Sequence, residues 1–276
     1  MSRWPSNLTA AAVLIAVMAF AASPALAQAP PGPPRPPIEV TGATLIEYDD
    51  TTGVLRAEGS PVVFTRGQTV VRAPRLRYDT RARIATASGG VEVTEPGLYL
   101  RAQDTELRMT DDRIRMSGDV QVRRVHDDGA VTLSAALVEG SLATRRFIAS
   151  GAVTVDRDDW TVSGRRVDYD DHSRVAVVTG DPAARLKDAT MTAQTITVAM
   201  ADERAKGEGG VVLRRGDLVG RAPRVDISRR DNLAVLSGGA QVDRGNDRMI
   251  ADIIEVNLDS ARATARGRAR VIFSSP

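Results

Sequence analysis

A glycine returns along this chain at an almost constant interval, and this repeat limits the folds the chain can adopt. The recurring residues are Gly59, Gly89, Gly118, Gly151, Gly180, Gly209, Gly238 and Gly267. Successive intervals are 30, 29, 33, 29, 29, 29 and 29 residues. A constant period of roughly 20 to 50 residues indicates stacked copies of one small structural unit. We therefore expect about eight units of about 29 residues each.

Apolar residues around each glycine are spaced two apart. In most units they occur two and four residues after the glycine, two and four before it, and eleven and thirteen before it. This alternation is typical of a strand with one buried face. No segment between residues 38 and 273 keeps a 3.6-residue period long enough for a helix. The sequence thus predicts an all-β chain of two or three short strands per unit, with the glycine at a bulge or corner.

Acidic pairs mark the places where one strand passes to the next. Asp49-Asp50, Asp111-Asp112 and Asp170-Asp171 are examples, and aspartate favours turns because its carboxylate accepts bonds from its own backbone. The extra residues of the long interval are expected in a longer hairpin loop at residues 124–129. One unit cannot bury its apolar face alone. Stacked units can, so we expect a continuous apolar surface inside the repeat.

The first 37 residues read as an export signal and a linker. Arg3 precedes an apolar run at residues 8–20, which is too short to span a bilayer comfortably, and Ala25-Leu26-Ala27 matches an A-x-A cleavage site. We expect a signal peptide at residues 1–27, cleaved after Ala27; the alternative is an uncleaved anchor. Residues 28–37, QAPPGPPRPP, form a stiff extended linker. Residues 38–276 form the repeat domain.

The composition removes several function classes. The chain has no Cys and only two His, His126 and His172, which excludes disulfides and argues against a metal site. Basic and acidic residues are interspersed, which argues against a nucleic-acid partner. There is no G-x-S-x-G, P-loop or H-E-x-x-H motif. The acidic pairs follow the repeat, so we interpret them as turns rather than as calcium ligands or catalytic carboxylates. We expect no enzymatic activity, no metal and no cofactor.

The repeated unit resembles the LptA/OstA family. The resemblance rests on an apolar–x–Tyr-Asp strand, a turn, and an alternating run that ends in Gly-x-Val-x-Val. The chain has it as LRYDTRARIATASGGVEV, RVDYDDHSRVAVVTG and, more loosely, ELRMTDDRIRMSGDVQV. It covers about residues 38–273. The chain departs from the family pattern in two respects: it is long enough for two tandem family-sized modules, and Thr105 and Gly140 replace apolar residues of the repeat.

This resemblance implies a repetitive β-jellyroll, a V-shaped folded antiparallel sheet whose apolar groove shields lipid acyl chains. It also implies a periplasmic bridge that carries lipopolysaccharide or a related lipid toward the outer membrane. The many alanines of the repeat leave room for acyl chains. The alternative is a structural or adhesive β-solenoid with a dry, filled core. The predicted groove residues are Tyr48, Tyr78, Val120, Val122, Tyr169, Val198, Ile227 and Val256.

The last unit predicts a partner surface. Its strand, ARGRARVIFSS, would leave an unpaired edge that can template pairing with another chain. The partner would be another copy bound head to tail, or an inner- or outer-membrane transport component. Alternatively, the arginines guard the edge and keep the protein monomeric. The predicted edge residues are Arg268, Arg270, Val271 and Phe273.

Overall fold

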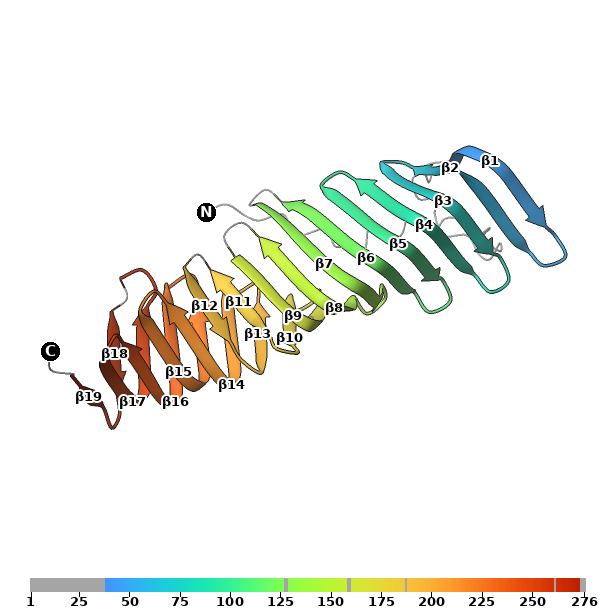
Figure 1. The fold of residues 1–276 in the computed structure, drawn as a ribbon. Coiled ribbons are helices and arrows are strands. Elements are labelled where there is room, and N and C mark those ends of the chain that lie inside the picture. The colour runs from blue at the N-terminus through green and yellow to red at the C-terminus, as the bar shows by residue number, and fades with distance from the viewer. Residues whose placement is uncertain (1–37, 127–128, 158–159, 187, 261, 274–276) are drawn as a thin grey trace, which may run out of the picture. The chain divides into compact units, whose positions relative to one another are not determined.

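The computed structural model describes residues 38–126, 129–157, 160–186, 188–260 and 262–273. In this part of the chain the regular structure consists of nineteen β-strands (Figure 1). The prediction of an all-β repeat fold is confirmed. The described residues contain no helix that could span a membrane. The predicted signal peptide and proline-rich linker lie outside the described residues.

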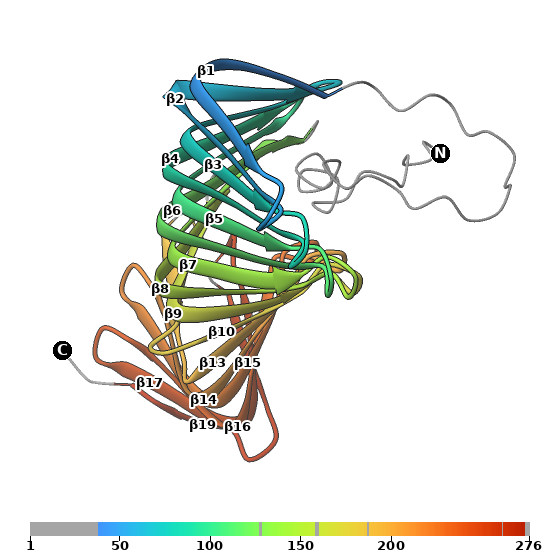
Figure 2. The same cartoon turned by 90° about the vertical axis from the view of Figure 1, so that its right-hand side faces the viewer.

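The chain divides into two compact units, Met1–Phe147 and Ile148–Pro276. In the first unit each strand pairs antiparallel with the next, as Figure 2 shows for β1 to β7. The strands are β1 (Ile38–Asp49), β2 (Val54–Arg66), β3 (Thr69–Asp79), β4 (Ile84–Glu95), β5 (Leu98–Arg108), β6 (Arg113–His126) and β7 (Gly129–Ser141). The tandem modules expected from the chain length stay a prediction.

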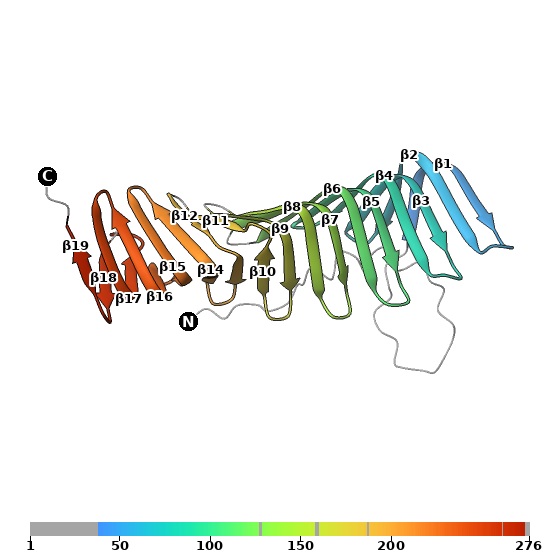
Figure 3. The ribbon, with the colours of Figure 1, turned by 60° about the horizontal axis from the view of Figure 1, so that its bottom comes forward.

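The second unit repeats this antiparallel order, but three of its strands are each divided into two short ones (Figure 3). Its long strands are β8 (Arg146–Arg157), which begins at the boundary, β9 (Trp160–Asp170), β14 (Arg204–Arg215), β15 (Leu218–Ser228), β16 (Leu233–Arg244) and β17 (Asp247–Asn257). Its short strands are β10 (Val175–Thr179), β11 (Ala183–Leu186), β12 (Ala189–Thr192), β13 (Thr195–Ala199), β18 (Ala263–Arg266) and β19 (Arg270–Ile272).

The recurring glycine lies where the strand ladder is interrupted, as the repeat predicted. Register shifts fall at these positions, for example between Ser88 and Val91 and between Ser237 and Ala240. From Gly89 onward each recurring glycine has a φ between +68° and +91°, and the next residue also has positive φ. Two successive residues in this region bend the strand. We call this pair the corner of each unit.

The two corner positions have different steric requirements. The first is always glycine, because a Cβ there would meet the preceding strand; at Gly238 it would lie 3.2 Å from the Pro223 Cγ. The second position is open, and a Cβ on Gly239 would have no atom within 4 Å. It therefore accepts residues other than glycine, namely Asp119, Ala152, Asp181 and Arg268.

The corner, or the interruption of the ladder opposite it, divides each long strand into two parts. The turn-side half runs from the corner to the turns that contain the acidic residues, and the hairpin-side half runs from the corner to the tight hairpins. In the turns, Asp79 accepts backbone N–H bonds from Arg81 at 3.1 Å and Ala82 at 2.8 Å. Asp49, Asp170 and Asn257 accept the equivalent bonds. The assignment of the acidic residues to turns is confirmed.

The hairpin between β6 and β7 corrects one expectation. The sequence predicted a longer loop over residues 124–129, but β6 continues to His126 and β7 starts at Gly129. Antiparallel pairs extend to Arg124↔Val131 and Val125↔Ala130. Residues 124–126 therefore lengthen a strand, because their backbone groups find partners across the ladder.

Candidate functional site

Two rows of inward-facing side chains cross the turn-side halves of successive strands. In the row nearer the turns, a residue from one strand lies opposite a residue from the next, as in Tyr78↔Ala85 and Ala85↔Leu107. The second unit has Val198↔Ala205 and Ala205↔Ile227. Larger side chains thus alternate with alanine at many steps. Antiparallel pairing places these residues on one face.

The structure places most of the predicted groove residues in the interior. Tyr78, Val120 and Val256 are buried, and Val122, Tyr169, Val198 and Ile227 are half-buried. Tyr48 is instead 56% exposed, because β1 pairs with β2 and no other strand among the described residues covers its inward face. The outward neighbours Arg224 and Asp226 are exposed. Contact of these residues with lipid stays a prediction.

The interior is closed to water at many positions. Val62 and Val120 in the first unit are fully buried, as are Ile196, Leu236 and Ile254 in the second. These residues come from both the turn-side and the hairpin-side halves, so the two halves of each strand cover one another. A lipid chain would have to separate the two halves to reach these rows.

The two departures from the apolar repeat have different consequences. A Cβ on Gly140 would meet the ring of Phe147, so that ring occupies the space of the missing side chain. Thr105 lies opposite Ala87 and Met116 in the second inward row, which is two residues nearer the corner than the first. Its hydroxyl is buried and has no hydrogen-bond partner within the described residues. The apolar surface is therefore continuous at Gly140 but interrupted by a polar atom at Thr105.

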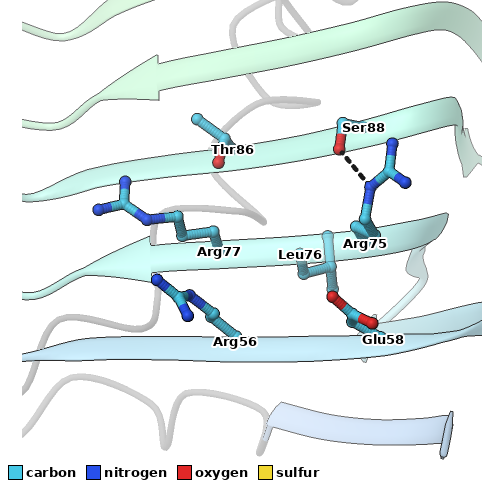
Figure 4. Close-up of a pocket in the computed structure, with 7 residues that line it drawn as sticks. All are labelled: Arg56, Glu58, Arg75, Leu76, Arg77, Thr86 and Ser88. Carbon is cyan, nitrogen blue, oxygen red and sulfur yellow. Dashed lines mark hydrogen bonds between the residues drawn. The ribbon is translucent and has the colours of Figure 1, made fainter. Parts of the chain in front are cut away.

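A separate hollow lies on the outward face of β2, β3 and β4. Figure 4 shows Arg56, Arg75 and Arg77 along it. The volume of the hollow is about 230 Å³. Arg75 Nε donates to Ser88 Oγ at 3.3 Å, and Arg77 Nη2 pairs with Asp79 at 3.4 Å. Its lining is mainly charged and hydroxylic, so it is unsuited to acyl chains. Among the described residues, no group of three or more His, Cys, Asp or Glu side chains could hold a metal ion.

The predicted partner edge lies at β19 and the corner before it. Val271 and Phe273 are exposed, by 43% and 77%, and Arg270 is also exposed. Val271 pairs with Met249 of β17. Arg268 instead donates to the Asp252 carboxylate at 3.0 and 2.6 Å, and this bond lowers the pKa of Asp252. Arg268 is thus held by its own sheet.

The sequence reasoning missed the exposed end of the apolar rows at β1. Ile46 is 57% exposed although it belongs to the inward row and lies opposite Ala57. The signal was present, because Ile46 and Tyr48 continue the columns of later units. The first strand of a stack has a neighbour on only one side, so its inward residues are the least covered.

Comparisons with known proteins found one family match, and it covers part of the chain. Residues 161–262 match the family described as "LptA/(LptD N-terminal domain) LPS transport protein". A solved structure of LptH, the LptA homologous periplasmic component of the conserved lipopolysaccharide transport device from Pseudomonas aeruginosa, is 16% identical. The match covers 52% of this chain and 83% of that chain, with a TM-score of 0.30. No curated protein matches the chain.

Proposed function

We propose that this chain carries lipopolysaccharide by enclosing the acyl chains of the lipid. The family match over residues 161–262 makes the chain LptA/OstA-like and supports a role in lipopolysaccharide transport. The observation that supports this proposal is the pair of inward apolar rows crossing successive strands in each unit. A row that continues from strand to strand offers an acyl chain the same environment along the stack.

Burial of acyl groups provides the driving force. Each buried CH₂ contributes about 0.8 kcal/mol, so a 12-carbon chain gains roughly 9 kcal/mol before ordering costs. The net gain is smaller, because the chain replaces contacts that already exist between the two halves of each strand. The alanines of the rows limit that loss, since small side chains make fewer contacts than leucine or phenylalanine.

A photo-crosslinker at defined positions tests this proposal in cells. At Val198 or Ile227, which face the interior, we expect covalent capture of lipopolysaccharide or another acylated lipid. At Arg224 or Asp226, which lie near Ile227 on β15 but face the solvent, we expect no capture. Equal capture at both pairs of positions would mean that the lipid has no preference for the interior.

A structural scaffold with a dry core is the second candidate function, and the fully buried interior favours it. This alternative predicts no lipid adduct at any of the four positions. It also predicts no lipid in a solvent extract of the purified, denatured protein, which mass spectrometry can measure. Under both proposals the chain is non-enzymatic.

The location and the partners of the protein belong to the same proposal. We propose export to the periplasm with cleavage after Ala27, which the intact mass of the protein from a periplasmic fraction would test. We also propose that strand edges at Arg270, Val271 and Phe273 pair with a second copy or with inner- or outer-membrane transport components. Light scattering of the full chain and of a chain ending near Gly267 tests this contact. Concentration-dependent oligomers only in the full chain support it.

A further inference from the structure

Arginine recurs at the last inward-facing position of the hairpin-side half. This position carries Glu95, Arg124, Arg157, Leu186, Arg215 and Arg244. The intervals are 29, 33, 29, 29 and 29 residues, so the position belongs to the same repeat as the corner glycine. Within the second unit, Arg215 and Arg244 lie on β14 and β16, with β15 between them.

These two arginines adjoin the apolar interior of the second unit. Leu218 pairs with Arg215 on one side and with Arg244 on the other, and it is 2% exposed. The buried row therefore reaches Leu218, and a guanidinium flanks it on each side. Neighbouring strands lie about 4.8 Å apart, so two strand spacings place the backbones of Arg215 and Arg244 about 10 Å apart. We call Arg215 and Arg244 the arginine rim.

Arg215 joins the two halves of the second unit. Its Nε pairs with the Asp188 carboxylate at 3.1 Å, on the hairpin side. Its Nη2 donates to the main-chain oxygen of Asp259 at 3.4 Å, and Asp259 lies in the turn after β17. The side chain is only 21% exposed. The guanidinium therefore lies across the boundary between the interior and the solvent.

One nitrogen of this guanidinium has no acceptor. The Arg215 Nη1 has under 1 Å² of exposed surface and no hydrogen-bond partner among the described residues. A buried N–H group without an acceptor is costly, and such groups are few in folded proteins. The geometry thus provides a charged donor, next to an apolar interior, that lacks an oxygen atom to bind.

We propose that the arginine rim binds the phosphate group of a lipid whose acyl chains enter the interior of the second unit. This inference rests on the proposed function and adds the chemical class of the headgroup. Phosphate suits a guanidinium because two parallel N–H donors can meet two of its oxygens. The carboxylates of Asp188 and Asp217 pair with Arg215 and Arg244, at 3.1 and 3.8 Å. The phosphate shares or replaces these partners.

Binding of simple amphiphiles to the purified protein tests the rim. The probes are dodecyl phosphate, dodecyl maltoside and inorganic phosphate, each measured by calorimetry below the micelle concentration. We expect Arg215→Gln to weaken binding of dodecyl phosphate by roughly tenfold, the effect of losing one charged hydrogen bond. Binding of dodecyl maltoside, which has the same chain and no phosphate, is expected to stay unchanged.

Arg221→Gln is the matched control, because it removes the same charge from the outward face of β15. Arg221 pairs with Asp243 at 2.6 Å and is half-exposed. If Arg221→Gln weakens binding of dodecyl phosphate as much as Arg215→Gln does, the effect is one of net charge and the proposal of a phosphate site at the rim is wrong. Arg244→Gln, at a half-exposed side chain, provides the same test if Arg215→Gln does not fold. The rim is also wrong if both rim variants bind like the unchanged protein.

The remaining outcomes separate this inference from the proposed function. If inorganic phosphate binds as tightly as dodecyl phosphate, the rim is a free-anion site and the lipid part of the inference is overturned. If neither amphiphile binds, the proposed function fails and the rim fails with it. If both amphiphiles bind equally and no rim variant changes either affinity, the interior binds lipid and only the rim is rejected.

Discussion

The ring of Phe147 lies against Gly140, in the space that a side chain at that position of β7 would occupy. Gly140 interrupts the apolar repeat in the sequence, but Phe147 restores the apolar contact from the following segment. A residue that looks like a gap along one strand is thus filled from its neighbour. The two positions act as one packing unit within the first unit of the fold.

Substitution of Gly140 by valine is expected to destabilise the protein. The new side chain would overlap the Phe147 ring, and overpacking of this kind typically costs about 1–3 kcal/mol. Thermal unfolding measures the change. Phe147→Ala also destabilises the protein by leaving a cavity, but the double variant should lose less than the sum of the two. Strict additivity in this cycle would contradict the packing relationship.

The corner glycines provide a second, sterically matched comparison. Gly238 and Gly239 have φ values of +91° and +90°, so alanine is strained at both. Only Gly238 faces a rigid neighbour, because its Cβ would lie 3.2 Å from Pro223 Cγ. We expect Gly238→Ala to lower the unfolding free energy by roughly 1 kcal/mol more than Gly239→Ala. Denaturant titration measures this difference, and equal losses would show that the Pro223 contact is irrelevant.

The parts of the fold that the sequence predicted are those set by local periodicity. The two-residue alternation predicted strands, and the 29-residue glycine period predicted corners, because both follow from backbone geometry at each unit. Acidic pairs such as Asp49-Asp50 predicted turns for the same reason. The sequence could not predict that Phe147 fills the space above Gly140 or that Tyr48 is exposed. Both depend on which strand covers which, and no local pattern contains that information.

The residues of the candidate site also fall into those that local periodicity predicts and those that depend on tertiary contacts. The inward direction of Val120, Val198 and Val256 follows from alternation, so their inward position was predictable. The arginine rim recurs with the same period but was not predicted, because the sequence does not show which arginines border a buried row. Its role becomes apparent only when Arg215 is seen between Leu218, Asp188 and Asp259.

The Asp79 turn is expected to make stability depend on pH. Backbone N–H bonds from Ala82 and then Arg81, with the charge of Arg77, lower the pKa of Asp79 below its ordinary value of 3.8. Because the folded pKa is the lower one, the stabilisation is present above about pH 4 and is lost as the pH falls through the folded value. NMR titration of the carboxyl group measures this pKa directly.

Asp79→Asn separates the charge from the turn. Asparagine keeps an oxygen that can accept the same two backbone bonds, but it does not titrate. We expect the melting temperature of the unchanged protein to fall more steeply below pH 4 than that of Asp79→Asn. Parallel curves for the two proteins would show that Asp79 contributes nothing to acid sensitivity.

The exposed end of the inward row at β1 yields the last prediction. Ile46 faces the interior side of its strand and is 57% exposed, whereas Leu45 on the opposite face is 43% exposed. If a second copy extends the sheet at β1, its own inward row must cover Ile46. Covering the exposed part of Ile46 contributes about half of the roughly 1.5–3 kcal/mol of a whole isoleucine, and Ile46→Asp also places an unpaired charge there, so it is expected to weaken self-association roughly tenfold. Leu45→Asp adds the same charge one residue away, on the face that such a partner leaves in solvent, and is expected to have little effect. Sedimentation equilibrium measures the self-association of both variants.

Equal weakening by both variants would mean that charge alone prevents association, and no weakening by Ile46→Asp would mean that copies do not meet at β1. Both residues are largely exposed, so the melting temperatures of both variants should remain close to that of the unchanged protein, and a large drop would attribute lost association to unfolding instead.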